Sequence, residues 1–191
     1  MHNCLVGSEM CIRDSHSSHT MELILENVEV PQRNLVAEEG MGFKIALTAL
    51  NNGRITMGAT ALGIARSALE VALSHSKERQ QFGKPISEFQ GVSFMLSDMA
   101  MQLDAARLLV KRAAYLKDAG QNFIKEAAMA KCFATDMAMK VTTDAVQILG
   151  GSGYTREFPL ERFMREAKVL QIVEGTNQIQ RLVIARELLK A

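Results

Sequence analysis

One stretch of the sequence decides the fold, residues 126–153, which read EAAMAKCFATDMAMKVTTDAVQILGGSG. Its apolar residues recur at steps of three and four, which places them along one side of a helix. These residues are Ala127, Ala130, Ala134, Met137, Val141, Ala145 and Ile148. Most of them are small, so neighbouring helices can approach this side closely. The glycine-rich run 150–153 then stops the helix.

Two further helices are expected before this one. Apolar residues are dense from Ile45 to Ala72, enough to bury the first helix on more than one side, and residues 51–53 are a candidate kink. Residues 81–88 form a connection. Ser87 followed by Gln90 is a capping-box signature for the second helix. The coiled-coil-like seam of that helix consists of Val92, Leu96, Met99, Leu103, Ala106, Val110 and Ala113.

A short helix near residues 159–168 and a last helix from about residue 177 to 189 complete the pattern. Long helices joined by short loops pack as antiparallel neighbours. We therefore predict an all-α fold, an up-down four-helix bundle over residues 41–191, preceded by one or two β-strands.

The first forty residues differ from this pattern. The run CLVGSEMCIRDS, residues 4–15, looks like translated sequencing-adapter read-through, so we interpret residues 1–19 as a disordered, non-native leader. Residues 20–40 alternate apolar and polar side chains up to Pro31, which is typical of a strand. A lone strand leaves its backbone hydrogen bonds unpaired, so we expect it to be the terminal strand of a missing middle β-domain. The chain is then a fragment.

Composition excludes several kinds of partner. The 191 residues include 22 Lys and Arg and 21 Asp and Glu, and the net charge of +1 predicts no nucleic acid and no membrane as partners. No apolar run reaches the roughly 18 to 20 residues that cross a bilayer. Cys4, Cys11 and Cys132 have no paired spacing, so we assign no disulfide and no metal. Cys132, on an apolar helical face, is expected to be a buried, inert thiol.

Three short stretches do not fit the bundle pattern. Residues 78–85 resemble a polar helix end and turn, but Arg79, Gln81 and Phe82 also offer a charged fork, a donor and an apolar ring, which suit an anionic ligand. Residues 147–153 resemble a helix C-cap, but their three glycines would also let backbone amides approach a phosphate or a ring. Composition alone leaves both alternatives open.

The third stretch, residues 172–181, contains a candidate base. A carboxylate just before a helix usually complements the helix dipole. Thr176 is better placed to cap the last helix, which leaves Glu174 beside two apolar residues with Gly175 behind it. Glu174 is therefore a candidate general base.

Three runs together resemble signature stretches of the acyl-CoA dehydrogenase family, in the same order and at the same spacing. The runs are ERQQFGKPISEFQ (78–90), DAVQILGGSGYTREFPLERFMREAK (144–168) and VEGTNQIQRLVIARELL (173–189), and Arg54 matches upstream. The similarity covers residues 21–191, which correspond to the last sheet strand and the C-terminal bundle of such an enzyme. It implies that the chain is the C-terminal part of a flavin-dependent acyl-CoA dehydrogenase.

The resemblance also implies roles for the matched residues. Glu174 would be the catalytic base, and Gly175 would lie against the bound thioester. Arg54 and Asn51 would contact the CoA portion, although many relatives carry an acidic residue where Asn51 stands. The residues implied to hold FAD are Arg79, Gln81, Phe82, Gln90, Gln147 and Gly151, which would reach a neighbouring subunit, and Thr176 and Gln178, which would act within their own subunit.

The implied reaction is α,β-dehydrogenation of an acyl-CoA to a trans-2-enoyl-CoA. Glu174 would remove the α-proton and FAD would accept the β-hydride, while the amide of Glu174 and a flavin hydroxyl stabilise the enolate. The implied partners are the acyl-CoA substrate, an electron-transferring flavoprotein, and identical chains in a homodimer or homotetramer. The expected location is cytoplasmic in a bacterium or the mitochondrial matrix in a eukaryote. An acyl-CoA oxidase and a non-catalytic helical interaction module remain as alternatives.

Overall fold

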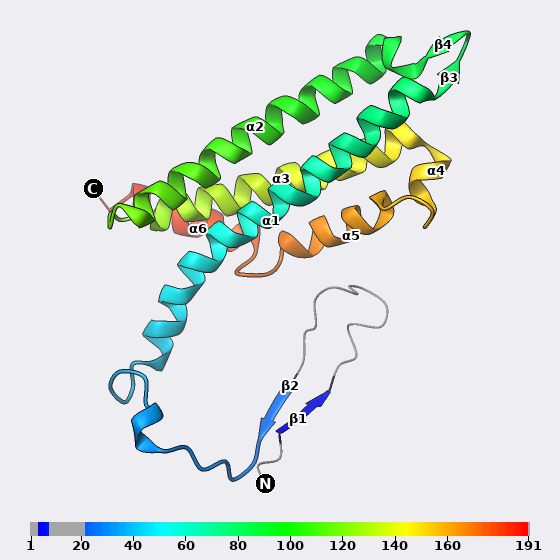
Figure 1. Cartoon of the computed structure of the whole chain (residues 1–191). Helices are drawn as coiled ribbons and strands as arrows, with labels where there is room; N and C mark the ends of the chain where they lie inside the picture. The colour runs from blue at the N-terminus through cyan, green and yellow to red at the C-terminus, as the bar shows by residue number, and fades with distance from the viewer. Residues whose placement is uncertain (1–3, 8–21, 191) are drawn as a thin grey trace. The chain divides into compact units, whose positions relative to one another are not determined.

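The structure, a computed structural model, describes residues 4–7 and 22–190 (Figure 1). The chain divides into two compact units, Met1–Thr48 and Ala49–Ala191. Most of the leader expected at residues 1–19 lies outside the described residues, and its interpretation as non-native stays a prediction.

The first unit holds a small two-stranded sheet. β1 (Cys4–Gly7) pairs antiparallel with β2 (Glu22–Leu25), and the single-turn 3-10 helix η1 (Gln32–Asn34) follows. The strand expected after residue 20 is therefore present as β2. Residues 4–7 differ from the disorder expected for them, because the backbone groups of one strand are a template on which a second strand pairs. The missing β-domain stays a prediction.

The second unit is a helical bundle, which confirms the predicted fold class (Figure 1). Its long helices are α1 (Gly42–Glu78, which begins in the first unit), α2 (Gln90–Asp118) and α3 (Ile124–Leu149). The shorter helices are α4 (Gly151–Tyr154), α5 (Leu160–Leu170) and α6 (Asn177–Leu188). A hairpin of β3 (Gln80–Gln81) and β4 (Lys84–Pro85), then the 3-10 helix η2 (Ile86–Glu88), joins α1 to α2. Among the helices described, none is long and apolar enough to cross a membrane.

Helix α3 lies at the centre of the bundle because its small side chains let other helices close on it. It contacts α2, α5 and α6, and Ala127, Ala130 and Ala134 are fully buried. α1 comes close at Gly58, where an added Cβ would lie 2.9 Å from the Val110 side chain of α2 and 3.5 Å from the Ala130 carbonyl oxygen of α3. Contacts this close leave no room for larger side chains, which explains the small-residue pattern of the sequence.

The helix ends follow the sequence only in part. Thr176 caps α6 as expected, since its hydroxyl accepts a hydrogen bond from the backbone N–H of Ile179 at 3.4 Å. Gly150 ends α3 with a φ of 60°, as the glycine-rich run predicts. The capping box predicted at Ser87 and Gln90 is wrong, because Ser87 lies inside η2 and α2 begins at Gln90 without a side-chain cap.

Candidate active site

Glu174 and Gly175 form a left-handed turn in the connection between α5 and α6. The backbone φ is 55° at Glu174 and 86° at Gly175. This region costs a non-glycine residue roughly 1–2 kcal/mol, so surrounding contacts must hold Glu174 in place. Gly175 adopts it readily, and an added Cβ there would lie 2.9 Å from Nε2 of Gln180. The Glu-Gly pair thus builds a sharp turn that presents a carboxylate just ahead of α6.

The Glu174 carboxylate lies against Gly53 of α1. A Cβ added at Gly53 would lie 2.7 Å from Oε2 and 2.9 Å from Cδ of Glu174. A side chain at position 53 therefore requires the carboxylate to move. Residues 51–53, the candidate kink, lie within helix α1, where Gly53 leaves space for the carboxylate.

Arg54 supplies a positive charge one residue further along α1. Its side chain is buried, and its Nη1 donates a hydrogen bond to Oδ1 of Asn51 at 2.9 Å. Burial lowers the pKa of Arg54, and the nearby charge of Glu174 opposes that shift. The Nε–H is buried without an acceptor in the part of the chain that the structure describes. A buried donor without a partner is costly, so this guanidinium is suited to meet an oxygen atom of a ligand.

Lys131 lies on the inner side of the turn, and the sequence analysis did not single it out. It is fully buried on α3, and its Nζ donates to the carbonyl oxygen of Gly175 and to Oδ1 of Asn177, both at 2.9 Å. Burial lowers the pKa of Lys131 to about 8. A signal for this residue was present in the sequence. Lys131 stands four residues after Ala127 and three before Ala134, on the buried side of the helix.

Asn177 and Asp136 extend this buried network. Nδ2 of Asn177 donates to Oδ1 of Asp136 at 2.6 Å, and Arg181 donates to Oδ2 of the same carboxylate at 2.8 Å. Gln171 adds a third donor at 2.7 Å. Burial raises the pKa of Asp136, but these hydrogen bonds outweigh burial and hold the pKa below its usual value. Beside them Cys132 is buried as expected, and burial raises the pKa of its thiol.

A pocket of about 500 Å³ opens beside the start of α6. Thr176 and Gln178, the two residues implied to touch FAD within their own subunit, both line it. Lys168 and Arg181 add positive charge to its wall, Gln171 adds a carboxamide, and Asp136, which pairs with Arg181, adds a negative charge. The pocket therefore combines hydrogen-bond donors with the positive charge of Lys168, which suits an anionic group of a ligand.

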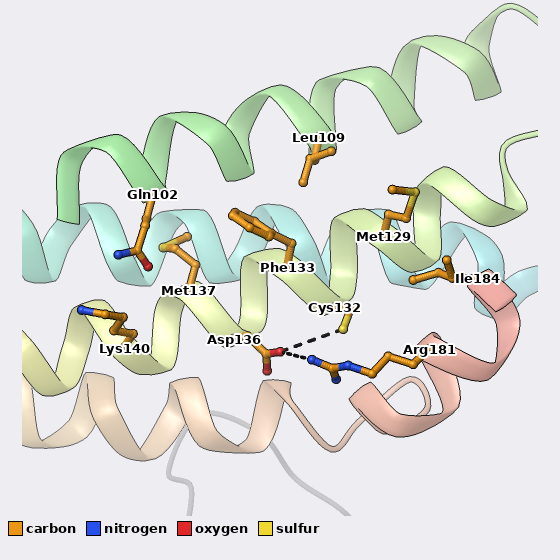
Figure 2. A pocket seen from close by; sticks show the side chains of 10 residues that line it. All are labelled: Gln102, Leu109, Met129, Cys132, Phe133, Asp136, Met137, Lys140, Arg181 and Ile184. Atoms are coloured by element: carbon orange, nitrogen blue, oxygen red, sulfur yellow. Dashed lines mark hydrogen bonds and ion pairs between the residues drawn. The ribbon is translucent and has the colours of Figure 1, made fainter. Parts of the chain in front are cut away.

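A second pocket, of about 450 Å³, is lined from α2, α3 and α6 (Figure 2). Its wall includes the apolar side chains of Leu109, Met129 and Phe133, with the Asp136–Arg181 ion pair on one side. The residues that line it include none of the site residues predicted from the sequence. This pocket is therefore distinct from the candidate active site, although Asp136 and Arg181 border both cavities.

The other residues implied to hold FAD lie far from Glu174. All are exposed, and they are Arg79, Gln81, Phe82, Gln90, Gln147 and Gly151. They belong to or adjoin β3, β4, α4 and the neighbouring helix ends, which share one end of the bundle (Figure 1). Gly53 and Glu78 are 25 residues apart on α1, which corresponds to roughly 37 Å at about 1.5 Å per residue. One chain therefore presents two separate groups of candidate residues.

Comparison with known proteins finds relatives that share the sequence pattern. Residues 40–189 match the family model described as acyl-CoA dehydrogenase, C-terminal domain. The short-chain specific acyl-CoA dehydrogenase of Megasphaera elsdenii is 54% identical over 175 residues, which covers 92% of this chain and 46% of that protein. The chain thus spans about half the length of the curated relatives that it matches.

Solved structures agree with this match. Butyryl-CoA dehydrogenase from Megasphaera elsdenii superposes with a TM-score of 0.92 at 51% identity, over 97% of this chain and 48% of that one. A chain from a structure of the electron transferring flavoprotein of Acidaminococcus fermentans superposes with a TM-score of 0.93 at 53% identity, over 100% of this chain and 50% of that one.

Proposed function

Because the chain belongs to the acyl-CoA dehydrogenase family, we propose that it is the C-terminal part of a FAD-dependent enzyme that converts an acyl-CoA to a trans-2-enoyl-CoA. Glu174 is the base in this proposal. The observation that carries it is the left-handed turn that holds the Glu174 carboxylate against Gly53 and close to the buried charge of Arg54.

The proposed chemistry requires more than a carboxylate. The α-proton of a thioester is weakly acidic, so hydrogen bonds must stabilise the enolate as Glu174 removes the proton. We assign one of these bonds to the backbone amide of Glu174. Gly175 has no side chain to obstruct the thioester, and we assign Arg54, with Asn51 hydrogen-bonded to it, to the CoA portion.

The residues present fit FAD in two places. Within one chain, Thr176 and Gln178 line the 500 Å³ pocket together with Lys168 and the Asp136–Arg181 ion pair. When bound, FAD supplies the acceptor for the β-hydride. The second group, around β3, β4 and α4, is exposed and lies roughly 37 Å along α1 from Gly53. This separation supports the proposal that the second group holds the flavin of a neighbouring subunit.

We expect Arg79→Ala in the full-length parent to reduce FAD retention about ten- to 100-fold, because a charge-assisted hydrogen bond contributes about 1.5–3 kcal/mol. The rate of α-proton removal by the flavin-loaded fraction should stay within about two-fold of the parent. Flavin content after gel filtration measures the first effect. Arg66→Ala is the control, because exposed Arg66 pairs with Glu70 on its own helix. Equal flavin content in parent and Arg79→Ala would remove Arg79 from the cofactor site.

An exposed apolar stripe on α2 supports self-association. Phe94, Met101, Leu108 and Tyr115 recur every seven residues and are 63%, 64%, 63% and 71% exposed. A seven-residue repeat of this kind packs against another helix. We therefore propose a homodimer or homotetramer of the full-length enzyme, in which neighbouring subunits complete each flavin site.

The proposed electron acceptor is an electron-transferring flavoprotein. Relatives at 54% identity are named dehydrogenases, which favours this acceptor over the oxygen used by an acyl-CoA oxidase. The alternative of a non-catalytic helical module does not explain the left-handed turn at Glu174. The location, cytoplasmic in a bacterium or the mitochondrial matrix in a eukaryote, stays a prediction.

The test of the proposed function is anaerobic titration of the full-length parent with acyl-CoA thioesters of different chain lengths. Bleaching of the flavin absorbance together with formation of enoyl-CoA is the expected result. An electron-transferring flavoprotein should reoxidise the reduced flavin of a dehydrogenase, and air should do so only slowly. The reduced flavin of an oxidase would react rapidly with air. A flavoprotein that no acyl-CoA bleaches would overturn the proposal.

A further inference from the structure

We propose that Lys131 and Gln180 are positioning residues that hold the Glu174–Gly175 turn and thereby aim the base at the α-proton. This inference rests on the proposed role of Glu174. Neither residue is needed to touch the substrate, because both act through the backbone of the turn.

The two side chains donate hydrogen bonds to the turn from two different helices. The Gly175 carbonyl oxygen accepts hydrogen bonds from Nζ of Lys131 on α3 and from Nε2 of Gln180 on α6, both at 2.9 Å. The same Nε2 donates to the Glu174 carbonyl oxygen at 3.1 Å. Both peptide carbonyls of the turn are therefore fixed to rigid elements. Rotation of Glu174 out of its left-handed conformation would break these bonds, so they maintain the backbone from which the carboxylate projects.

The bundle itself does not require an amine at this position. Burial of a charged group is unfavourable, and an apolar side chain of similar length would fill the same space. Without Lys131, the Gly175 carbonyl would still be bonded to Gln180, and Oδ1 of Asn177 would lie 3.2 Å from the Thr135 hydroxyl, whose single hydrogen is shared with the carbonyl oxygen of residue 131 at 2.8 Å. Lys131→Met therefore leaves each acceptor with a donor within reach, and we expect it to fold. What it removes is the charged donor that restrains the turn.

The charge of Lys131 allows a test that distinguishes a positioning role from a purely structural one. The charged or titratable groups around it are Cys132 and Asp136 on α3, Arg54 on α1 and Glu174 on the turn. Burial lowers the pKa of Lys131 to about 8, so the ammonium becomes a neutral amine as the pH rises through that value. A neutral donor makes a weaker hydrogen bond than a charged one. The rate of proton removal should therefore fall above about pH 8 in the parent, and Lys131→Met should lack this step.

The experiment compares four full-length proteins: parent, Lys131→Met, Gln180→Met and the control Lys140→Met. Lys140 lies on the same helix but its side chain is 52% exposed and pairs with Asp144. Flavin content, the spectral change on acyl-CoA binding, and the rate of anaerobic flavin bleaching at saturating acyl-CoA are measured from pH 6 to 10. We expect bleaching about ten-fold slower or more in both turn variants, since displacement by about 1 Å can cost 10²-fold. Substrate binding should be unchanged, and backbone amides 174–177 should exchange hydrogen faster.

The outcomes separate this inference from the proposed function. Glu174→Gln is measured alongside, and normal bleaching in that variant would defeat the proposed function itself. If Glu174→Gln is inactive while Lys131→Met bleaches within about two-fold of the parent, the positioning role alone is overturned. If Lys131→Met does not fold, Gln180→Met decides by the same criterion. Failure of both variants to fold would show that the network supports the bundle, which would also overturn the positioning role.

Discussion

Replacing Glu174 by Gln in the full-length parent should slow flavin bleaching by acyl-CoA by about 10⁴-fold or more. General-base contributions are typically about 10²- to 10⁴-fold, and a carbon acid as weak as a thioester belongs at the upper end of that range. Gln keeps the shape of the side chain, so it should still fit against Gly53. The flavoprotein should fold, and acyl-CoA should still perturb its spectrum, because the CoA contacts are assigned to Arg54 and Asn51.

Stopped-flow mixing of parent and variant with saturating acyl-CoA under anaerobic conditions measures this effect. The matched control is Glu70→Gln on α1, whose carboxylate is 60% exposed and pairs with Arg66. If Glu174→Gln bleached within about ten-fold of the parent rate, Glu174 would not be the base.

The fold could be predicted from the sequence because the residue pattern that specifies each helix is local and repeated. The step of three and four through Ala127, Ala130 and Ala134 specifies a helix side, and their small size specifies that other helices pack closely on it. The prediction failed at a boundary, where Ser87 and Gln90 matched a capping box that the chain does not form. Several turn types share such a four-residue pattern, so the residues alone do not choose between a 3-10 turn and a helix cap.

The candidate site could be predicted only where one residue carries the signal. Glu174 was indicated by its position before a helix that Thr176 already caps, and the structure bears out that cap. Gly53 was assigned to a kink and Lys131 was missed. Both lie against a turn far away in the sequence, and no local pattern encodes such contacts. The sequence did contain a signal for Lys131, because a lysine on the buried side of an alanine-rich helix needs a buried acceptor.

The contact between Gly53 and Glu174 leads to a prediction in which stability and activity separate. Gly53→Ala should lower the bleaching rate by about ten- to 100-fold, because the new Cβ would lie 2.7 Å from Oε2 and must displace the carboxylate. The flexible end of a glutamate can move at little cost in stability. Alanine also favours a helix interior over glycine by about 0.5–1 kcal/mol, so the thermal melting temperature should stay equal or rise. Melting curves and stopped-flow bleaching of the same preparations measure both effects.

Gly63→Ala provides the control on the same helix. A Cβ at Gly63 would meet no atom within 4 Å, so this variant should gain the same helix stability and keep the parent rate of bleaching. The difference between the two glycine variants therefore isolates the position of the Glu174 carboxylate from any change in α1. If Gly53→Ala bleached as fast as Gly63→Ala, the space beside Gly53 would not determine where the base acts. If Gly53→Ala melted several degrees below the parent, the Glu174 carboxylate would be held too firmly to move. The lower bleaching rate would then reflect strain in the turn.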